Sequence, residues 1–375
     1  VPKVNNKTRG YVKGEPFTKV TYQEFNPGSR PQIVDRLKSK YGWVPEELTD
    51  KGNPILDDEV LSALDYPEAK VLGEYLTIKK RLGQIADGQK AWLKYVNNQD
   101  SCMHGEVVTN GCITGRCAHR NPNMGQVPAS YSPYGKECRS LFHAPDGWDL
   151  LGVDAKALEL RCLGGYLALW DDGEYANLVT DESVDIHVYN QDKFGVPTRD
   201  IAKRLIYAML YGCGNEKAGG IVDPNEKDPV QLKQLGRNAI NGFMDGVPAL
   251  KQLKHKLASA VQKRGYLRGL DGRALFCRSD FSALNVLLQG AGAMIMKQVI
   301  INTHNNLEAK GLVHGRDWAQ HAMIHDEIQL SCPKNHTALV KEQALLAFPQ
   351  AQQFFAFRCE IEGDAKVGWS WDQTH

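Results

Sequence analysis

Apolar and polar positions recur with two different periods along the chain, and these periods predict where helices and strands lie. Apolar residues spaced three or four apart predict amphipathic helices over residues 67–85, 249–266, 283–297 and 337–356. Short runs in which apolar and polar residues alternate predict strands around Val153, over 323–330 and over 357–361. A chain that mixes helices with a few short strands is typical of an α+β fold.

The run from Met323 to Leu330 has a polar centre, His325-Asp326-Glu327, inside an otherwise apolar sequence. This pattern predicts two short strands that meet at a tight turn. Carboxylates close to a core are costly unless a cation, hydrogen-bond donors or a proton compensates their charge. The turn is therefore a candidate functional site.

A second acid, Asp154, occurs where the predicted strand around Val153 gives way to a helix that begins near Ala157. Asp154 on a strand and Asp326 at a hairpin tip could together hold two Mg²⁺ ions, because hard cations prefer carboxylate oxygen. Such a metal pair stabilises both the attacking and the leaving oxygen of a phosphoryl displacement. Acids at turns are also common on protein surfaces, so spacing alone leaves both interpretations open.

A helix that Thr198 or Asp200 can cap is predicted to run to Tyr211-Gly212. Arg199, Lys203 and Tyr207 recur on it at every fourth position, so one face carries two cations followed by an aromatic ring. Cations one turn apart can bind a triphosphate, and an aromatic ring beyond them can contact a base. An ordinary amphipathic surface helix shows the same pattern.

Two further segments carry groups suited to DNA. The loop-rich region around Arg116, Asn123 and Gln126 offers a cation and amides, which is what contact with minor-groove acceptors requires. Lys80 and Arg81 lie near the end of the predicted helix over 67–85, where a cationic face suits phosphate contact or simply faces solvent. The cysteines and histidines between residues 102 and 119 match no common zinc spacing.

Composition fits a soluble protein with a large core. Of the 375 residues 42% are hydrophobic and 24% charged, and we expect no apolar run long enough to span a bilayer. The net charge is only +1, but the first forty residues hold nine Lys/Arg against three Asp/Glu, which fits an arm on a polyanion or a solvated terminus. Nine cysteines at irregular spacing indicate reduced thiols in a cytoplasm-like compartment. Because the chain begins with Val1, we expect a processed product or a piece of something longer.

Taken together, these segments resemble a family A (Pol I-like) DNA polymerase, most similar to the branch encoded by short-tailed phages. Each segment alone is weakly specific, but all five occur in the family's order and span nearly the whole chain. The motifs that carry the resemblance are Thr114-Gly115-Arg116, Asp154 with Leu158-Glu159-Leu160-Arg161, Arg199-x₃-Lys203-x₃-Tyr207-x₃-Tyr211-Gly212, Leu287-Leu288-Gln289-Gly290-Ala291-Gly292-Ala293 and His325-Asp326-Glu327.

The resemblance implies a fold like a right hand. Residues 1–97 would form the thumb, with its start incomplete. Residues 98–166 and 285–375 would form a palm built on an antiparallel sheet, and residues 167–284 would form helical fingers.

The resemblance also implies a role for each motif residue. Asp154, Asp326 and the Ala155 carbonyl would hold two Mg²⁺ ions, with Glu327 as a further catalytic acid nearby. Glu159, His187, Arg199, Lys203 and Tyr207 would bind the incoming nucleotide, with Tyr207 partnered by Glu159. The remaining predicted residues would contact DNA: Arg116, Gln289, His325, Asn123, Gln126, Lys80 and Arg81.

The implied activity is template-directed synthesis on primer–template DNA from dNTPs, as part of phage replication in the cytoplasm of an infected host cell. A Tyr at position 207 implies ready use of dideoxynucleotides. The chain has neither the length nor the spaced acids of an upstream 3′–5′ exonuclease domain, so no proofreading is expected. A processivity factor or a separate exonuclease chain is an expected partner, and a membrane is not.

Two other interpretations stay open. The chain could be a non-catalytic nucleic-acid-binding or assembly fragment of a polymerase whose other half is a separate polypeptide. It could also be a two-metal nuclease built on Asp154 and Asp326, although a nuclease has no need for the Arg199–Lys203–Tyr207 face. Incubating a labelled primer–template with and without dNTPs separates these alternatives.

Overall fold

A computed structural model describes residues 1–18, 21–45, 47–49 and 51–375. The chain divides into two compact units, Val1–Ala91 and Trp92–His375. The boundary at Ala91 lies close to residue 97, where the sequence places the end of a thumb. The assignment of thumb, palm and fingers to particular residues stays a prediction.

The first unit packs three helices around a small apolar core. Pro at the first turn starts the third helix, and Asp57 caps the second by accepting a hydrogen bond from the Val60 amide at 2.9 Å. Ile33, Leu37 and Leu61 are fully or almost fully buried between the helices. The helices are α1 (Arg30–Tyr41), α2 (Asp58–Ala63) and α3 (Pro67–Leu82), and a π-helical turn, η1 (Gly83–Asp87), continues α3.

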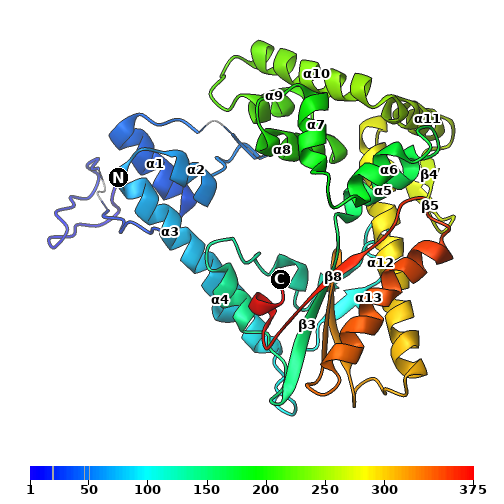
Figure 1. Cartoon of the computed structure of the whole chain (residues 1–375). Coiled ribbons are helices and arrows are strands. Elements are labelled where there is room, and N and C mark those ends of the chain that lie inside the picture. The colour runs from blue at the N-terminus through cyan, green and yellow to red at the C-terminus, as the bar shows by residue number, and fades with distance from the viewer. Residues whose placement is uncertain (19–20, 46, 50) are drawn as a thin grey trace. The chain divides into compact units, whose positions relative to one another are not determined.

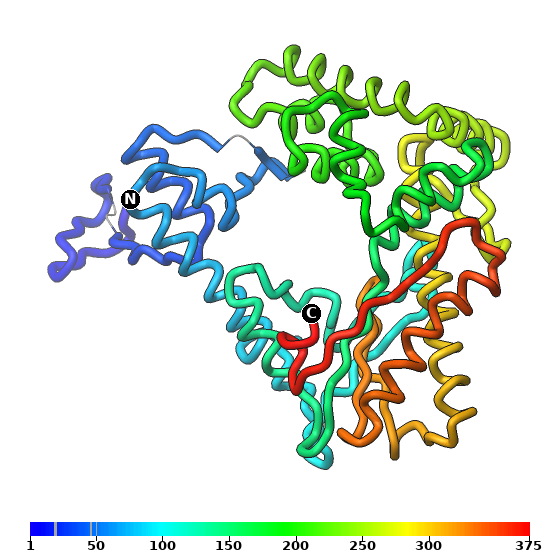
Figure 2. The backbone as a smooth tube through the Cα atoms, viewed as in Figure 1, coloured from blue at the N-terminus to red at the C-terminus, as the bar shows by residue number. Residues whose placement is uncertain are grey.

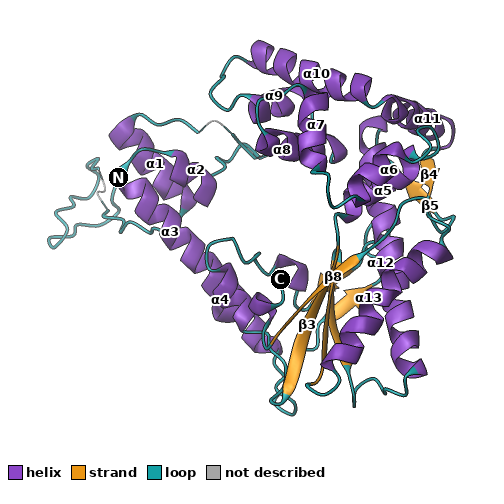
Figure 3. Cartoon of the chain, viewed as in Figure 1, coloured by secondary structure: helices purple, strands orange, loops and turns teal. Residues whose placement is uncertain are grey.

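The second unit is built on one antiparallel sheet in the strand order β6-β7-β3-β8. Strand β3 is central and has a nearly continuous buried run, Leu150–Val153, as expected for a strand covered on both faces. Figure 3 shows the strands gathered in this sheet with helices packed beside them. The strands are β3 (Trp148–Ala155), β6 (Ala319–Ile324), β7 (Glu327–Pro333) and β8 (Gly363–Gly368).

Two long helices, α12 (Ala283–Ala309) and α13 (Thr337–Phe354), pack against each other, and α13 also covers the sheet (Figure 1). Helices α5 to α11 form the helical part of this unit, and two small hairpins lie outside the main sheet. Their bounds are α5 (Leu158–Leu167), α6 (Glu174–Thr180), α7 (Ile186–Phe194), α8 (Arg199–Leu210), α9 (Asn215–Val222), α10 (Pro229–Gly246), α11 (Pro248–Arg264), β1 (Glu106–Val108), β2 (Ala118–Arg120), β4 (Tyr266–Arg268) and β5 (Ala274–Phe276). The short elements are α4 (Gly135–Ser140), η2 (Trp92–Tyr95), η3 (Met124–Gln126), η4 (Asp280–Ser282) and η5 (Trp371–Gln373).

Three expectations from the sequence need correction. First, the helix predicted to end at Lys297 continues to Ala309. Second, no apolar run long enough to span a bilayer was expected, but this helix together with η4 is long and apolar enough by length and composition alone. Most of it is buried inside the protein, as in the core helix of a soluble domain. The strand predicted over 357–361 is absent from that segment, and the edge strand begins at Gly363 instead.

Candidate active site

Asp154 and Asp326 meet because β3 pairs with the β6–β7 hairpin. Asp154 stands opposite Glu327 in the antiparallel register, and the Ala155 amide donates to the Asp326 carbonyl at 3.0 Å. His325 takes a left-handed conformation with φ +60°, which closes the tight turn and places Asp326 at its tip. The two acids that the sequence singled out, 172 positions apart in the numbering (326 − 154), therefore lie at one end of the sheet.

The electrostatics of this acid pair favour a bound cation. Burial, together with the nearby carboxylates of Asp326 and Glu327, raises the pKa of Asp154 to about 7. Two carboxylates and the Ala155 backbone carbonyl form an all-oxygen donor set, which suits Mg²⁺ and leaves further coordination positions open. Among the described residues no group of three or more His, Cys, Asp or Glu side chains is arranged to hold a metal, so the site rests on this pair and backbone oxygen.

Glu327 is bound by protein donors on both of its oxygens. Its Oε1 accepts hydrogen bonds from Trp371 Nε1 at 2.8 Å and from Gln329 Nε2, and its Oε2 lies 2.8 Å from His375 Nδ1. Burial alone would raise the pKa of Glu327, but the His375 contact and these donors hold it below its usual range. Glu327 is therefore oriented by the protein, which suits a supporting role beside the pair better than direct metal binding.

A glycine in β3 lets the end of the chain reach Glu327. A Cβ at Gly152 would lie 2.2 Å from the Thr374 carbonyl oxygen, so a side chain larger than hydrogen would block this approach. Thr374 Oγ1 also contacts Gln329 Oε1 at 3.1 Å. Figure 2 shows this last part of the chain folded back alongside β3.

Helix α8 presents the predicted basic face. Thr198 caps it, accepting a hydrogen bond from the Ile201 amide at 3.3 Å, and Arg199 pairs with Asp185, the cap of α7, at 2.5 Å. Lys203 is exposed one turn along. Burial and then the nearby charges of Arg199 and Lys203 lower the pKa of His187 on α7. Its Nδ1 is buried and has no hydrogen-bond partner within the described part of the chain.

Tyr207 links this helix to the acid pair. Its pKa is raised by burial and by the charges of Glu159 and Asp326, and its ring centroid lies 6.1 Å from that of His187. The predicted pairing of Tyr207 with Glu159 during nucleotide binding stays a prediction. Glu159 accepts a hydrogen bond from the Tyr211 hydroxyl at 2.6 Å, and Arg116 Nη2 lies 3.7 Å from the same carboxylate.

The loop that carries Arg116 is held from outside. Lys297 on α12 donates to the carbonyls of Thr109 and Gly115, each at 2.6 Å, and Arg273 donates to Asn110 at 3.1 Å. Arg116 and His325 line the same small cavity beside the acid pair, together with His119. The structure thus brings together two residues that the sequence assigned to DNA from segments far apart.

The other predicted DNA contacts are less concentrated. Gln289 lies on α12, where the neighbouring Gly290 faces the carbonyl of Thr114 in the Arg116 loop. Asn123 caps η3 by accepting from the Gly125 amide at 3.1 Å, which gives it a structural role, and Gln126 ends that turn. The last two, Lys80 and Arg81, lie in the last turn of α3 in the first unit.

The chain as a whole is similar to known proteins of one family. The family model described as DNA polymerase family A matches residues 6–373. The chain belongs to DNA polymerase family A. The resemblance drawn from the five motifs is thereby confirmed.

Several curated relatives are DNA polymerases from phages and bacteria. The chain is 42% identical to the DNA-directed DNA polymerases of Enterobacteria phage T3 and Escherichia phage T7, over 98% of its own length and 55% of theirs. It is 26% identical to DNA polymerase I of Pseudomonas aeruginosa over 94% of its length. The chain therefore spans about half the length of the phage relatives.

A solved family A structure shows the same fold. It is the POL domain of Pol1 from M. smegmatis, described as a complex with DNA primer-template and dNTP. The two structures superpose with a TM-score of 0.77 at 19% sequence identity. The match covers 94% of this chain and 62% of the M. smegmatis chain. The predicted α+β fold with an antiparallel sheet is confirmed by this match.

The sequence did not predict the residues that orient Glu327 and fix the Arg116 loop. His375, Trp371 and Gln329 surround Glu327, and Lys297 holds the Arg116 loop. None of them lies in a local pattern that indicates chemistry. The polar residues of β7, above all Gln329, could have indicated these contacts. A buried amide side chain needs a hydrogen-bond partner.

Proposed function

We propose that residues 1–375 carry out template-directed DNA synthesis, adding deoxynucleotides to a primer 3′ end by two-metal phosphoryl transfer. The observation that carries this proposal is the meeting of the Asp154–Asp326 pair with the α8 face, linked through Tyr207. An acid pair alone fits many hydrolases, but a basic and aromatic helix beside it fits a nucleoside triphosphate substrate.

The acid pair and the Ala155 carbonyl would hold the Mg²⁺ ions. When bound, these ions lower the pKa of the primer hydroxyl and neutralise charge on the triphosphate and the leaving pyrophosphate. The charge of Asp154, which burial and its acidic neighbours disfavour, is then compensated. Phosphoryl transfer needs little covalent help, so alignment and charge neutralisation carry the rate.

The protein's own residues bind and align the substrates. Lys203, Arg199 and His187 would bind the triphosphate, for which Arg199 must exchange its exposed ion pair with Asp185. That exchange costs little, because solvent screens an exposed ion pair and leaves it little net stabilisation. Tyr207 would lie behind the new base and sugar, and Glu159 would crowd a ribose 2′-oxygen.

DNA would be recognised by shape rather than by sequence. Arg116 and Gln289 offer donors to minor-groove acceptors, which every base pair presents in similar positions. His325, at the hairpin turn next to Asp326, would contact the primer end. We place this activity in phage replication, in the cytoplasm of an infected host cell, with a processivity factor or a separate exonuclease chain as further partners.

Synthesis is the only activity that we assign to residues 1–375. The sequence of residues 1–375 does not carry the spaced acid motifs of a 3′–5′ exonuclease domain. We therefore expect no 3′–5′ proofreading from this part of the chain.

Primer extension tests the proposal directly. A labelled primer on a longer template is incubated with Mg²⁺, with and without dNTPs, and growth only with dNTPs is the expected result. Asp154→Asn and Asp326→Asn should abolish growth but keep duplex binding, while Asp146→Asn, an exposed acid in the turn before β3, should behave as wild type. Shortening without dNTPs would instead indicate a nuclease, and binding without either change would indicate a non-catalytic fragment.

Nucleotide binding is tested on α8. Lys203→Ala should raise the KM for dNTP by about tenfold to a hundredfold, as expected for loss of a hydrogen bond to a charged group. Arg204→Ala removes the same charge from the next exposed position and should leave the KM for dNTP close to that of wild type. An unchanged KM in Lys203→Ala would contradict the assignment of this face.

A further inference from the structure

Arg139, in the last turn of α4, is a buried cation held by a carbonyl and an aromatic ring. Only 5% of its surface is exposed, although arginine is rarely buried unless it is paired. Its Nε donates to the Pro128 carbonyl at 2.9 Å, while its Nη1 is buried and has no hydrogen-bond partner among the described residues. Arg161, which is similarly buried, instead forms an ion pair with Glu362 at 2.8 Å. The cost of burying the charge of Arg139 must therefore be offset in another way.

The guanidinium of Arg139 lies over the ring of a buried tryptophan. Its Cζ is 4.6 Å from the centre of the Trp371 ring, which is within the range of a cation–π contact, and Trp371 is buried. A flat guanidinium also stacks on an indole, which a lysine ammonium cannot do. Phe142 contacts the same ring edge-on at 5.7 Å between centroids, and its carbonyl accepts a hydrogen bond from the Trp371 amide at 2.9 Å. The end of α4 and the residues after it thus fix the position of this indole.

Trp371 connects this cation to the acids of the site. Its Nε1 donates to Glu327 Oε1 at 2.8 Å, and Glu327 follows Asp326 and stands opposite Asp154 in the sheet register. Burial lowers the pKa of Arg139, and the negative charge of Glu327 opposes this shift, so the two charges act on each other across the ring. A cation over an indole polarises the ring and strengthens the hydrogen bond that the ring donates. Arg139, Trp371 and Glu327 therefore form one connected unit of cation, ring and carboxylate.

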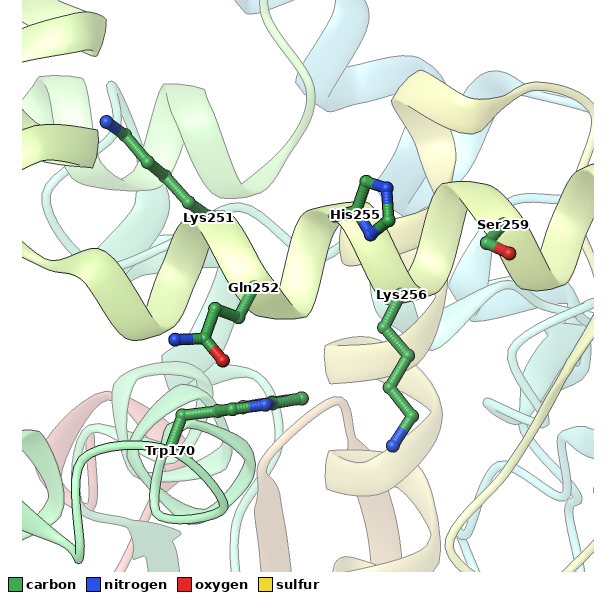
Figure 4. Close-up of a pocket in the computed structure, with 6 residues that line it drawn as sticks. All are labelled: Trp170, Lys251, Gln252, His255, Lys256 and Ser259. Atoms are coloured by element: carbon green, nitrogen blue, oxygen red, sulfur yellow. The ribbon is translucent and has the colours of Figure 1, made fainter.

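A second cation over an indole lies elsewhere in the chain and has no such connection. Lys256 Nζ of α11 is 5.4 Å from the centre of the Trp170 ring, in an open groove of about 590 Å³. Figure 4 shows Lys256 extending from α11 on the side of Trp170. The described residues that line this groove are polar, basic or aromatic, and none of them is acidic. The Lys256–Trp170 pair is therefore a matched control for the Arg139–Trp371 pair.

We propose that Arg139 is a positioning residue for DNA synthesis: it fixes the Trp371 ring and, through that ring, orients Glu327 and compensates its charge. A Glu327 released from the Trp371 N–H is free to turn toward Asp154, which adds a negative charge directly against the acid pair. The pair then no longer holds the reacting groups in one geometry. The inference rests on the proposed function, because Arg139 acts here on the acids to which synthesis is assigned.

Single-nucleotide primer extension with Mg²⁺ tests this role, with kcat and the KM for dNTP measured separately. Arg139→Gln and Arg139→Met both remove the charge, and Met keeps an unbranched apolar stem that fills the site. Each should lower kcat about ten- to a hundredfold, as expected for a small displacement of reacting groups, and leave the KM for dNTP within about twofold of wild type. Arg139→Lys should stay within about threefold of the wild-type kcat, because an ammonium over an indole is still a cation–π pair.

Two further variants test the connection through the ring. Trp371→Phe keeps an aromatic ring beneath Arg139 but removes the N–H that binds Glu327, so it should lower kcat about as much as Arg139→Gln. Adding Arg139→Gln to Trp371→Phe should then cost little more than Trp371→Phe alone. Lys256→Gln removes the cation from the control pair and should leave kcat close to that of wild type.

Thermal unfolding followed by circular dichroism identifies a temperature at which all variants are folded, and the kinetics are compared there. A kcat of Arg139→Met equal to or above that of Arg139→Lys would overturn the inference, because the site would then need packing and not charge. So would effects of Arg139→Gln and Trp371→Phe that multiply in the double variant. Extension by the wild type separates the two proposals: its absence overturns both, whereas extension with an unchanged kcat in Arg139→Gln and Arg139→Met overturns the positioning role alone.

Discussion

Asp154 lies in a half-buried position beside the two other carboxylates of Asp326 and Glu327. Its pKa, raised to about 7, means that the folded protein keeps a proton that the unfolded chain, with a pKa near 4, has already released. Between these two values the folded state binds more protons, so stability falls as pH rises through this window. Above about pH 7 the full cost of the charged, unpaired carboxylate is present.

Replacing Asp154 should therefore stabilise the metal-free protein in a pH-dependent way. With Mg²⁺ chelated, Asp154→Asn should raise the Tm by a few degrees at about pH 8 and by clearly less at about pH 5. Thermal unfolding followed by circular dichroism measures this difference. Adding Mg²⁺ should raise the Tm of the wild type but not of the variant, and an equal gain at both pH values would contradict the electrostatic account.

Tyr207 allows a second prediction about a single residue. The hydroxyl of Tyr207 faces the region of Glu159 and Asp326, where the sugar of the incoming nucleotide would lie. The wild type should use dideoxynucleotides readily, and Tyr207→Phe should reduce kcat/KM for them by about five- to tenfold relative to dNTPs, the worth of one hydrogen bond. Competition between a dNTP and its dideoxy analogue in primer extension measures the ratio. Strong rejection of dideoxynucleotides by the wild type would refute the role assigned to Tyr207.

At the scale of the elements, the sequence predicts the structure correctly where a single local pattern determines an element. The hairpin around Asp326 and the Thr198 cap of α8 follow from alternation and from a capping residue. The second half of helix α12, beyond the predicted end at Lys297, contains Asn302 and Asn306, and asparagine has a low helix propensity. In the structure both donate to carbonyls of α13, at 3.2 and 3.1 Å, and this tertiary contact carries the helix through.

The edge strand shows the opposite error. Phe357, Cys359 and Ile361 alternate like a strand, but each is buried separately in the main core without pairing to the sheet. The strand that does pair, Gly363–Gly368, is short and polar, so its sequence carries little β signal. The Glu327 contacts with Trp371 and His375 were likewise not predictable, because they join residues that only the folded sheet brings together.

The contact between α12 and the β1–β2 loop leads to a prediction about elements. Lys297 Nζ binds two loop carbonyls, and burial lowers its pKa, so the ammonium is committed to this loop rather than to solvent. Lys297→Met should raise the KM for primer–template about tenfold, because Arg116 is no longer held in place. Gln298→Ala, a change at the next position on the same helix, should leave this KM close to that of wild type.

A double-mutant cycle decides whether Lys297 acts through Arg116. If it does, adding Lys297→Met to Arg116→Ala should cost little more than Arg116→Ala alone. A merely structural role predicts effects that add, together with a loss of Tm that Arg116→Ala does not share. Additive effects would therefore contradict the positioning role.

At the scale of the whole molecule, the two units carry side chains that suit two different kinds of DNA contact. The second unit holds the acid pair, the α8 face and the Arg116 loop, which need defined geometry. The first unit offers cations on the last turn of α3. Backbone phosphates are bound mainly by counterion release, which depends on charge far more than on geometry. The two units should therefore differ in how binding responds to salt.

Changing both Lys80 and Arg81 to Gln tests this difference. Each phosphate contact contributes about 0.9 to the slope of log affinity against log salt, so the double variant should lower this slope by up to about 1.8. Binding to duplex DNA at low salt should weaken, whereas kcat at saturating DNA should stay close to that of wild type, because the catalytic groups lie in the second unit. Lys70→Gln with Lys90→Gln removes two other charges from the first unit and serves as the control. A slope that is unchanged in the Lys80 and Arg81 variant, or a fall in kcat without a change in slope, would show that these cations do not bind the backbone.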